Sequence, residues 1–353
     1  MKKISKIAAI VAALAFTTNS FAAEITLKLA HTWPTGFPLF ATSVDDYAQM
    51  VSEMSDGKIE IKIDSRNKHK APFGIFDFVK SGQYDIGQSF SYYYSGKEPN
   101  TLFFTTMPFG MTQQEQTAWL YNGGGLELAN EVYGKHGMEV MFGGNTGVQM
   151  GGWFRKEIKS VDDIKGLKMR IPGFGGKVIA GIGATVTNLP PGELYQALER
   201  GTLDALEWVG PSLDLRMGFH KIAPFYYTGW HEPGTEAIYM FNKEKMDSLP
   251  AWATSILKNA AKLTAFKSNV DQFDASANNW ESMKAEYPNI KVKNFPQEVV
   301  DALRASNEKL LKEEAAKSEM AKKILQSQAD YLKKARKWTS ISEQAYLNTI
   351  ADQ

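Results

Sequence analysis

The sequence predicts an α/β protein in which two lobes enclose a cleft. Three observations indicate this fold class. Segments with the patterns of strands and helices alternate from the start of the chain, one order of helix, glycine and strand occurs twice, and a long stretch without proline or glycine is able to connect two lobes. Alternating strands and helices are typical of α/β domains, and roughly 330 residues suffice for two of them.

The first elements form a strand, a helix and a strand. Residues 25–29 (ITLKL) and 59–63 (IEIKI) alternate apolar and polar side chains, as half-buried strands do. Between them, apolar residues recur at helical spacing over residues 44–54, and Gly57 is placed to terminate that helix. This order is the start of an α/β lobe.

One local pattern occurs twice along the chain. Residues 78–86 (FVKSGQYDI) combine the end of a helix, a capping glycine and an aspartate that opens a strand, and residues 198–205 (LERGTLDA) repeat this order. The recurrence indicates two lobes built alike. The alternative is a chance recurrence of a common connection between a helix and a strand. Both interpretations favour alternating helices and strands.

A long helix follows in the second half. Between Pro250 and Tyr287 the chain contains neither proline nor glycine. At about 1.5 Å per residue such a helix would reach roughly 55 Å, which exceeds one small domain, so we expect it to cross both lobes or to be kinked. Its apolar stripe consists of Trp252, Ile256, Ala260, Leu263 and Val270.

The expected lobes are discontinuous in sequence. One lobe takes residues 24–146 and about 233–260, and the other takes residues 147–232 and about 261–320. Residues 321–353 form a helical tail. Its apolar side chains need a partner surface, which either this chain's lobes or a second chain provides.

The N-terminus has the layout of a secretory signal peptide. Lys2, Lys3 and Lys6 precede an apolar run over residues 7–16, and small residues near Ala22 and Ala23 suit cleavage. We therefore expect residues 1–23 to direct export to the periplasm. The alternative is a retained amphipathic N-terminus. The chain has no cysteine, which excludes a secreted domain built on disulfides.

Composition and motifs argue against several functions. The 40 basic and 39 acidic side chains are balanced and form no long run of one sign, so the sequence lacks the basic surface that nucleic acid requires. Zinc-protease, serine-hydrolase and P-loop motifs are absent from it. Residues 173–176 (GFGG) match a phosphate loop only in part, and a tight turn or a crossover between lobes explains them as well.

The remaining candidates are binding groups near expected strand ends. Arg170 closes a short strand after a turn at Gly166, where a guanidinium is able to hold a carboxylate through two hydrogen bonds. The alternative is a solvated surface arginine. Glu207 and Trp208 end another strand, where they offer a cation ligand and a pocket wall. The alternative is a core tryptophan beside an acid that faces solvent.

Two further segments offer polar and aromatic groups. Residues 143–152 (GGNTGVQMGG) allow a ligand to approach closely and carry the amides of Asn145 and Gln149. The same glycines suit a hinge between lobes, and both interpretations can hold together. Tyr93 and Tyr94 follow a third expected strand and also lie near its tip.

These segments, in this order, resemble the solute-binding proteins of TRAP transporters, the DctP-type family. Residues 166–172 (GLKMRIP) are similar to that family's arginine strand, and residues 198–210 are similar to the unit that follows it. The resemblance extends from Ile25 to beyond Pro250. It is closest to the branch that binds 2-oxo acids, through the segments 146–153 (TGVQMGGW), 206–210 (LEWVG), 108–111 (PFGM) and 229–232 (GWHE).

The resemblance implies a fold, a site and partners. The fold is that of periplasmic binding proteins, and the ligand is a small 2-oxo or 2-hydroxy carboxylate held by Arg170, for delivery to TRAP membrane subunits. A metal ion, sodium in the first place and calcium as the alternative, binds at Gln149, Glu207, the Trp208 backbone and Glu232. Dimers that exchange a C-terminal helix are also implied.

The alternatives concern the ligand and the class of protein. If Lys68 or Lys70 reaches the pocket, a C4-dicarboxylate, a sugar acid or another organic acid becomes the expected ligand. A metal-dependent exported enzyme that uses Glu207 belongs to another class, and a sensor subunit would present the same bound ligand to a receptor.

Overall fold

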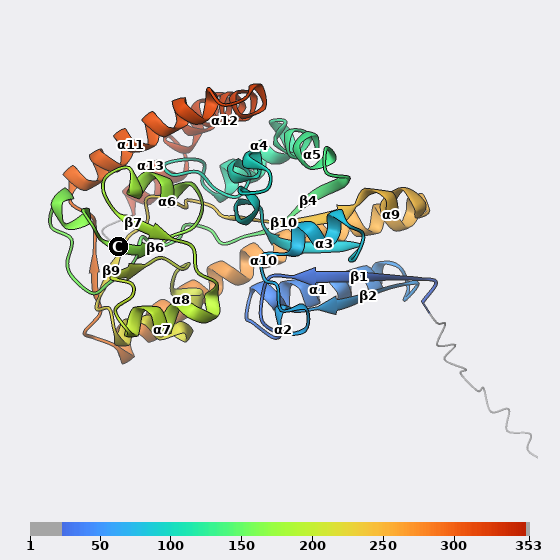
Figure 1. The fold of residues 1–353 in the computed structure, drawn as a ribbon, viewed down its shortest axis with the longest axis horizontal. Helices are drawn as coiled ribbons and strands as arrows, with labels where there is room; N and C mark the ends of the chain where they lie inside the picture. Colours follow the sequence, from blue (N-terminus) through green and yellow to red (C-terminus); the bar gives the residue numbers. More distant parts are fainter. Residues whose placement is uncertain (1–22, 351–353) are drawn as a thin grey trace, which may run out of the picture.

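The computed structural model of the protein describes residues 23–350 and contains two lobes, each built around its own β-sheet (Figure 1). This confirms the predicted two-lobed α/β fold. The predicted signal segment, residues 1–23, lies outside the described residues except for Ala23. Within residues 23–350, no helix is both long and apolar enough to cross a membrane.

The first lobe holds a five-stranded sheet with the order β2-β1-β3-β10-β4. Strands β1, β2 and β3 are parallel, whereas β10 runs antiparallel to both β3 and β4. The expected strands at residues 25–29 and 59–63 are confirmed as β1 and β2. The bounds are β1 Ile25–His31, β2 Ile59–Asp64, β3 Ile86–Phe90, β4 Met138–Asn145 and β10 Glu236–Asn242.

Helices flank this sheet. The helix expected over residues 44–54 begins four residues earlier, and its buried residues include Val44, Tyr47 and Val51. Gly57, with φ of 75°, follows its end as expected. The helices of this lobe are α1 Phe40–Met54, α2 Arg66–His69, α3 Ile75–Lys80, α4 Gln113–Asn122, α5 Gly125–Gly134 and α9 Lys243–Ser248.

The second lobe holds a six-stranded sheet with the order β11-β9-β5-β8-β6-β7. Strand β6 is parallel to β7 and β8, so their carboxyl ends meet at one edge. Strand β5 is antiparallel to β8 and β9. The bounds are β5 Gly152–Phe154, β6 Lys168–Arg170, β7 Thr185–Thr187, β8 Ala205–Leu206, β9 Phe225–Tyr227 and β11 Lys291–Lys293, with helices α6 Gly173–Ala180, α7 Leu194–Glu199 and α8 Pro211–Met217.

The recurring pattern of helix, glycine and aspartate has the same geometry in both lobes. Gly82 and Gly201 follow α3 and α7 with φ of 73° and 72°, a conformation that glycine adopts without strain. The carboxylate of Asp85 accepts a hydrogen bond from the backbone N–H of Lys28 at 2.8 Å. The carboxylate of Asp204 accepts one from the N–H of Lys168 at 3.0 Å. Each aspartate thus fixes the neighbouring parallel strand.

Helix α10 (Ala251–Glu286) is the expected long helix, with 36 residues, and it packs against α1 and β4 of the first lobe and against α8 of the second. Only part of its expected apolar stripe is buried: Ala260 is fully buried and Ile256 is half-buried. Trp252, Leu263 and Val270 are 40–52% exposed, whereas the buried residues are mainly small or polar. The helix comes too close to β4 for larger side chains, because a Cβ on Gly144 would lie 2.7 Å from the Ser268 Oγ.

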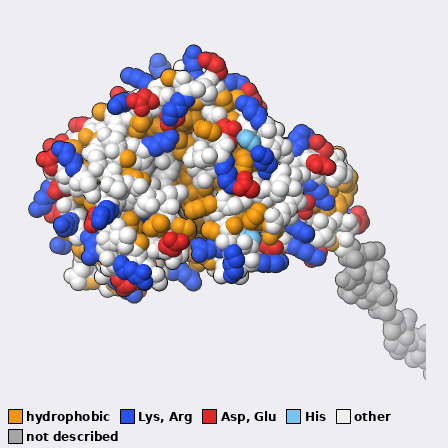
Figure 2. Space-filling model, in the orientation of Figure 1, with side chains coloured by type: hydrophobic (Ala, Val, Ile, Leu, Met, Phe, Trp, Pro, Cys, Tyr) orange, Lys and Arg blue, Asp and Glu red, His pale blue; other side chains and the backbone are white. Residues whose placement is uncertain are grey.

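Three helices complete the chain and cross from one lobe to the other (Figure 1). Helix α11 (Gln297–Ala315) packs on α6 of the second lobe. Helix α12 (Glu319–Thr339) turns back along it and packs on α4 and α5 of the first lobe, before the short α13 (Glu343–Thr349). The expected helical tail therefore lies on the first lobe. Figure 2 shows basic and acidic side chains interspersed over the visible face, in keeping with the balanced charge.

The chain passes between the lobes where β4 ends and β10 begins. Asn145 and Glu236 are paired there in register, and the Asn145 Nδ2 donates a hydrogen bond to the Glu236 Oε2 at 2.7 Å. Both side chains are buried. Burial raises the pKa of Glu236 to about 8, although the hydrogen bond from Asn145 opposes this shift.

This carboxyl predicts a pH dependence of stability. Between its ordinary pKa of 4.5 and about 8, the folded chain keeps a proton on Glu236 that the unfolded chain releases. The contribution of Glu236 to the free energy of unfolding therefore falls as pH rises through this window. Glu236→Gln should flatten the fall of Tm with pH. Glu127→Gln, at an exposed position of α5, should leave the fall of Tm with pH unchanged. Equal slopes of Tm against pH in both variants would contradict the role given to Glu236.

Candidate functional site

Arg170 is a buried charge at the tip of β6, with 1% of its surface exposed. Strand β8 pairs beside it and ends with Leu206, so Glu207 follows at the same sheet edge. The Arg170 Nη1 donates a hydrogen bond to the Glu207 backbone carbonyl at 2.7 Å and lies 3.4 Å from the Glu207 Oε2. Arg170 is therefore not a solvated surface arginine.

Trp208 connects this charge to the first lobe. Its side chain is 5% exposed, and the Arg170 Cζ lies 5.4 Å from the centre of its ring. On the first lobe, Phe37 and Phe40 meet the same ring edge-on at 6.3 and 6.4 Å. An aromatic wall from the first lobe thus covers the charged site of the second.

An acidic cluster surrounds the guanidinium. Glu207 and His231 are fully buried and Glu232 is 2% exposed. Each of the three offers a ligand atom, and these atoms lie within 4.8 Å of one another. The His231 Nε2 is 3.6 Å from the Glu207 Oε1, and the Thr235 hydroxyl donates a hydrogen bond to the Glu232 Oε2 at 2.6 Å.

Burial controls the protonation of this cluster. It raises the pKa of Glu207 well above its usual range, although the charge of Arg170 opposes the shift. It also raises the pKa of Glu232 to about 7, and the charge of Glu207 adds to this. The pKa of His231 falls to about 4 for the same reason, so its ring is neutral. A cation beside the two glutamates would favour their ionised forms.

Gln149 lies where the two crossovers between the lobes touch. Its backbone N–H donates a hydrogen bond to the Glu232 carbonyl at 2.9 Å, and its Nε2 donates one to the Thr146 Oγ1 at 2.9 Å. A Cβ on Gly229 would come within 1.9 Å of the Gln149 carbonyl oxygen, so this close crossing requires glycine.

The unpaired polar atoms of the site fall into two groups, hydrogen-bond donors and acceptors. Among the described residues, buried atoms without a hydrogen-bond partner include the donors Arg170 Nη2 and Trp208 Nε1 and the acceptors Gln149 Oε1 and Glu207 Oε1. Such atoms are rare in folded proteins and mark places for an ion or a ligand. Guanidinium and indole N–H groups suit a carboxylate, and carboxylate and amide oxygens suit a hard cation. The residues present therefore fit both groups.

The three other predicted site residues differ in how they relate to this centre. Tyr93 is half-buried and close enough for the charge of Arg170 to affect its pKa, which burial raises. Tyr94 is fully buried in the first lobe, where its ring lies 5.4 Å from that of Phe76. All polar atoms of the Asn145 amide are paired, with Gln116, Glu236 and two backbone N–H groups.

Sequence reasoning missed two residues. One is His231: the sequence shows no second histidine at metal-ligand spacing, yet the fold brings His231 to Glu207 from another segment. Its position next to Glu232 was the available signal. Arg66 of the first lobe lies against Gly192 of the second, where a Cβ would meet its Nη2 at 2.9 Å. Lys68, by contrast, is exposed and paired with Asp64 at 2.6 Å.

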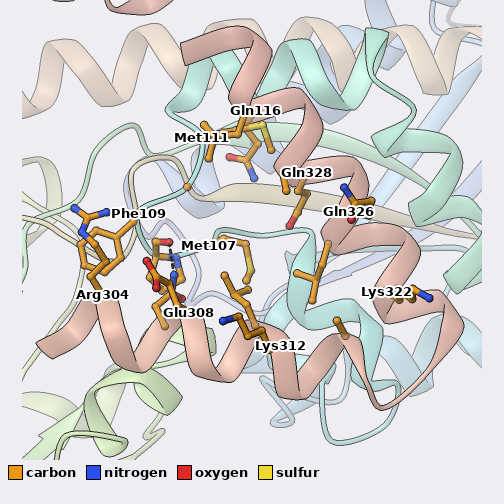
Figure 3. Close-up of a pocket in the computed structure, with 18 residues that line it drawn as sticks. Met107, Phe109, Met111, Gln116, Arg304, Glu308, Lys312, Lys322, Gln326 and Gln328 are labelled. Atoms are coloured by element: carbon orange, nitrogen blue, oxygen red, sulfur yellow. Dashed lines mark hydrogen bonds between the residues drawn. The ribbon is translucent and has the colours of Figure 1, made fainter. Parts of the chain in front are cut away.

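A separate cavity of about 490 Å³ lies between α11, α12 and the loop around residues 107–111 (Figure 3). Its lining includes Met107, Met111 and Leu325, and Arg304 stacks on Phe109 at one end with its Cζ 4.4 Å from the ring centre. None of the paired charges around Arg170 lines this cavity. It is therefore distinct from the charged site.

Comparisons with known proteins agree with this geometry. The family model of DctP, bacterial extracellular solute-binding protein, family 7, matches residues 29–318. A monocarboxylate 2-oxoacid-binding periplasmic protein of Nostoc sp. is 37% identical over 323 residues, which cover 91% of this chain and 88% of that protein.

Two solved structures are similar in fold and sequence. A TRAP periplasmic solute-binding protein of Colwellia psychrerythraea with bound calcium and pyruvate has a TM-score of 0.91 at 56% identity, covering 92% of this chain and 99% of that one. One from Pseudoalteromonas atlantica with bound sodium and pyruvate has a TM-score of 0.90 at 56% identity, covering 92% and 98%. The chain belongs to the DctP family of extracellular solute-binding proteins, which serve TRAP transporters.

Proposed function

We propose that this protein binds a small 2-oxo or 2-hydroxy monocarboxylate, such as pyruvate, together with a metal ion and delivers it to TRAP membrane subunits. The observation that carries the proposal is the unpaired Nη2 of the buried Arg170, next to buried oxygens that also lack partners. The pyruvate complexes of two relatives at 56% identity support the same ligand class.

The ligand carboxylate belongs on Arg170. A buried guanidinium is stable only when its charge and its N–H groups are paired. Glu207 pairs with Nη1, and Nη2 is left to donate to an organic anion. The indole N–H of Trp208 offers a second donor. A 2-oxo or 2-hydroxy oxygen of the ligand can then reach the cation.

The cation belongs on the acidic side of the site. Gln149, Glu207, Glu232 and the Trp208 backbone would hold it, with sodium expected first and calcium as the alternative. Oxygen ligands suit both ions. The ion would supply the positive charge that two buried carboxylates need beside a single guanidinium and a neutral His231.

Binding and closure of the lobes are linked. The charged groups come from the second lobe and the crossovers, whereas Phe37 and Phe40 of the first lobe cover Trp208. Ligand and ion satisfy groups that the covered form would otherwise bury unpaired, so they favour this form. An open protein would then release the ligand to the membrane subunits.

The candidate organic acids differ from one another in size and in charge. Lys68 pairs with Asp64 in solvent, which argues against the extra cation expected for a C4-dicarboxylate or sugar acid. Arg66 is a cation of the first lobe that contacts the second. A thermal-shift screen with pyruvate, lactate, succinate and a sugar acid distinguishes these ligands, and mass spectrometry of the recovered ligand would expose turnover by an enzyme.

A homodimer that exchanges C-terminal helices is also part of the proposal. The end of α12 and the following residues expose Trp338, Ile341 and Leu347, at 68%, 72% and 59% of their surfaces. An amphipathic helix with this much exposed apolar surface is expected to find a partner.

Arg170→Met should weaken pyruvate binding at least about 30-fold. Removing one partner of a buried, hydrogen-bonded charge pair costs about 2–5 kcal/mol, and each 1.4 kcal/mol is a factor of about ten. Calorimetric titration of the mature protein measures this, with circular dichroism to show that the variant is folded. Arg200→Met, at an exposed position of the same lobe, should bind as the wild type does. Equal affinity in the Arg170 variant would reject the role of the guanidinium.

Pyruvate should raise Tm only when sodium or calcium is present. A ligand at about 100 times its Kd adds about 2.7 kcal/mol to the free energy of unfolding, so the shift is measurable. Glu207→Gln should remove most of the dependence on the cation because it removes a charged ligand. Exposed Glu199→Gln is the matched control. An undiminished pyruvate shift in choline chloride with chelator would contradict the cation site.

A further inference from the structure

A buried carboxylate, that of Asp214 on helix α8, is bonded to the segment that follows β8. The residue is 1% exposed. Its Oδ1 accepts hydrogen bonds from the backbone N–H groups of Val209 and Gly210, at 3.1 and 3.0 Å. Asp214 thus fixes the two residues that directly follow Trp208.

The other oxygen of Asp214 is held by the sheet of the second lobe. Its Oδ2 accepts hydrogen bonds from the Trp153 Nε1 of β5 and from the Tyr226 hydroxyl of β9, both at 2.9 Å. The two rings stack with their centres 3.9 Å apart. Because β5 and β9 also pair with each other, the two donors are fixed by the sheet. The four hydrogen bonds together set the orientation of the carboxylate.

The hydrogen bond from Val209 also sets the direction of the Trp208 carbonyl. These two backbone groups belong to one peptide unit, and the described residues contain no cis peptide bond. In a planar trans peptide the N–H and the C=O point in opposite directions. Since the Val209 N–H points at Asp214, the Trp208 carbonyl points away from it.

The carbonyls on either side of Trp208 are already paired. The Glu207 carbonyl accepts a hydrogen bond from the Arg170 Nη1 at 2.7 Å, and the Val209 carbonyl accepts one from the Met150 N–H at 2.8 Å. Within residues 23–350, no hydrogen bond to the Trp208 carbonyl is found. Of these three successive carbonyls, that of Trp208 is therefore the one left to bind an ion.

We propose that Asp214 is a positioning residue for the cation site, which directs the Trp208 carbonyl toward the ion and strengthens that oxygen as a ligand. The inference rests on the proposed function, in which the Trp208 backbone is a cation ligand. An anion that accepts the N–H of a peptide polarises the peptide, so its carbonyl oxygen becomes more negative and suits a hard cation better. Partners that orient metal ligands are worth about 10- to 100-fold in affinity.

The first test observes the peptide between Trp208 and Val209. Trp208 is the only tryptophan that a valine follows in the sequence, so labelling the carbonyl carbon of tryptophan and the nitrogen of valine gives one correlated NMR signal. Calcium added to the mature protein at constant pyruvate should shift the carbonyl frequency of this signal. An unshifted signal, with calcium-dependent pyruvate binding still seen by calorimetry, would overturn the inference and leave the proposed function intact.

The second test changes the carboxylate and one of its donors. In Asp214→Asn, an amide whose oxygen stays on Val209 and Gly210 turns its own N–H groups toward the Trp153 N–H, so two donors conflict. The calcium concentration that gives half of the pyruvate-induced rise in Tm should increase at least about tenfold. Trp153→Phe keeps both contacts of Oδ1 and should leave this concentration unchanged. Added to Asp214→Asn, it removes the conflict and should restore part of the loss.

The calcium concentration separates positioning from a merely structural role. A structural role would lower the Tm of ligand-free Asp214→Asn and leave the calcium concentration as in the wild type, which would overturn the proposal. If this variant does not fold, the labelled signal of the wild type still decides. Pyruvate binding by the wild type without any cation would contradict the proposed cation site and this inference with it.

Discussion

The burial of Arg170 beside Glu207 is the constraint on which the site depends. Parallel pairing of β6 and β8 places the two residues at one sheet edge, and hydrogen bonds in both directions fix them there. The pair is incomplete, because one donor of the guanidinium and one oxygen of the carboxylate are left unpaired. Burying such atoms is costly, so the site is stable when an anion and a cation complete it.

The two lobes contribute unequally to this site. The second lobe and the crossovers supply its charges, and the first lobe supplies aromatic cover through Phe37 and Phe40. This division suits stepwise binding, in which the charged lobe captures the ligand and the aromatic lobe excludes water. Exclusion of water strengthens every charge interaction inside.

Much of the architecture was predictable because it rests on local signals. The glycine and aspartate of each repeated unit occupy the conformations that their chemistry favours, and Arg170 lies at a strand tip as parallel sheets require. The site itself was harder to predict from the sequence. His231 reaches Glu207 only through the fold, and the amide of Asn145 is fully paired in a way that no neighbouring residue reveals.

The stripe on α10 shows why periodicity alone misleads. Spacing locates an apolar face, but only the neighbouring elements decide whether that face is buried. Here the close approach of β4 at Gly144 leaves room for Ser268, and larger residues such as Leu263 and Val270 face outward.

That same choice has an energetic consequence for motion. The surface of α10 that faces the junction is lined by Thr264, Ser268 and Gln272, whose side chains water can solvate as well as protein can. Separation of the lobes at this surface therefore exposes little apolar area, so it costs little free energy of hydration. Opening of the lobes is consequently opposed mainly by the contact of Phe37 and Phe40 with Trp208 and by the groups that occupy the charged centre.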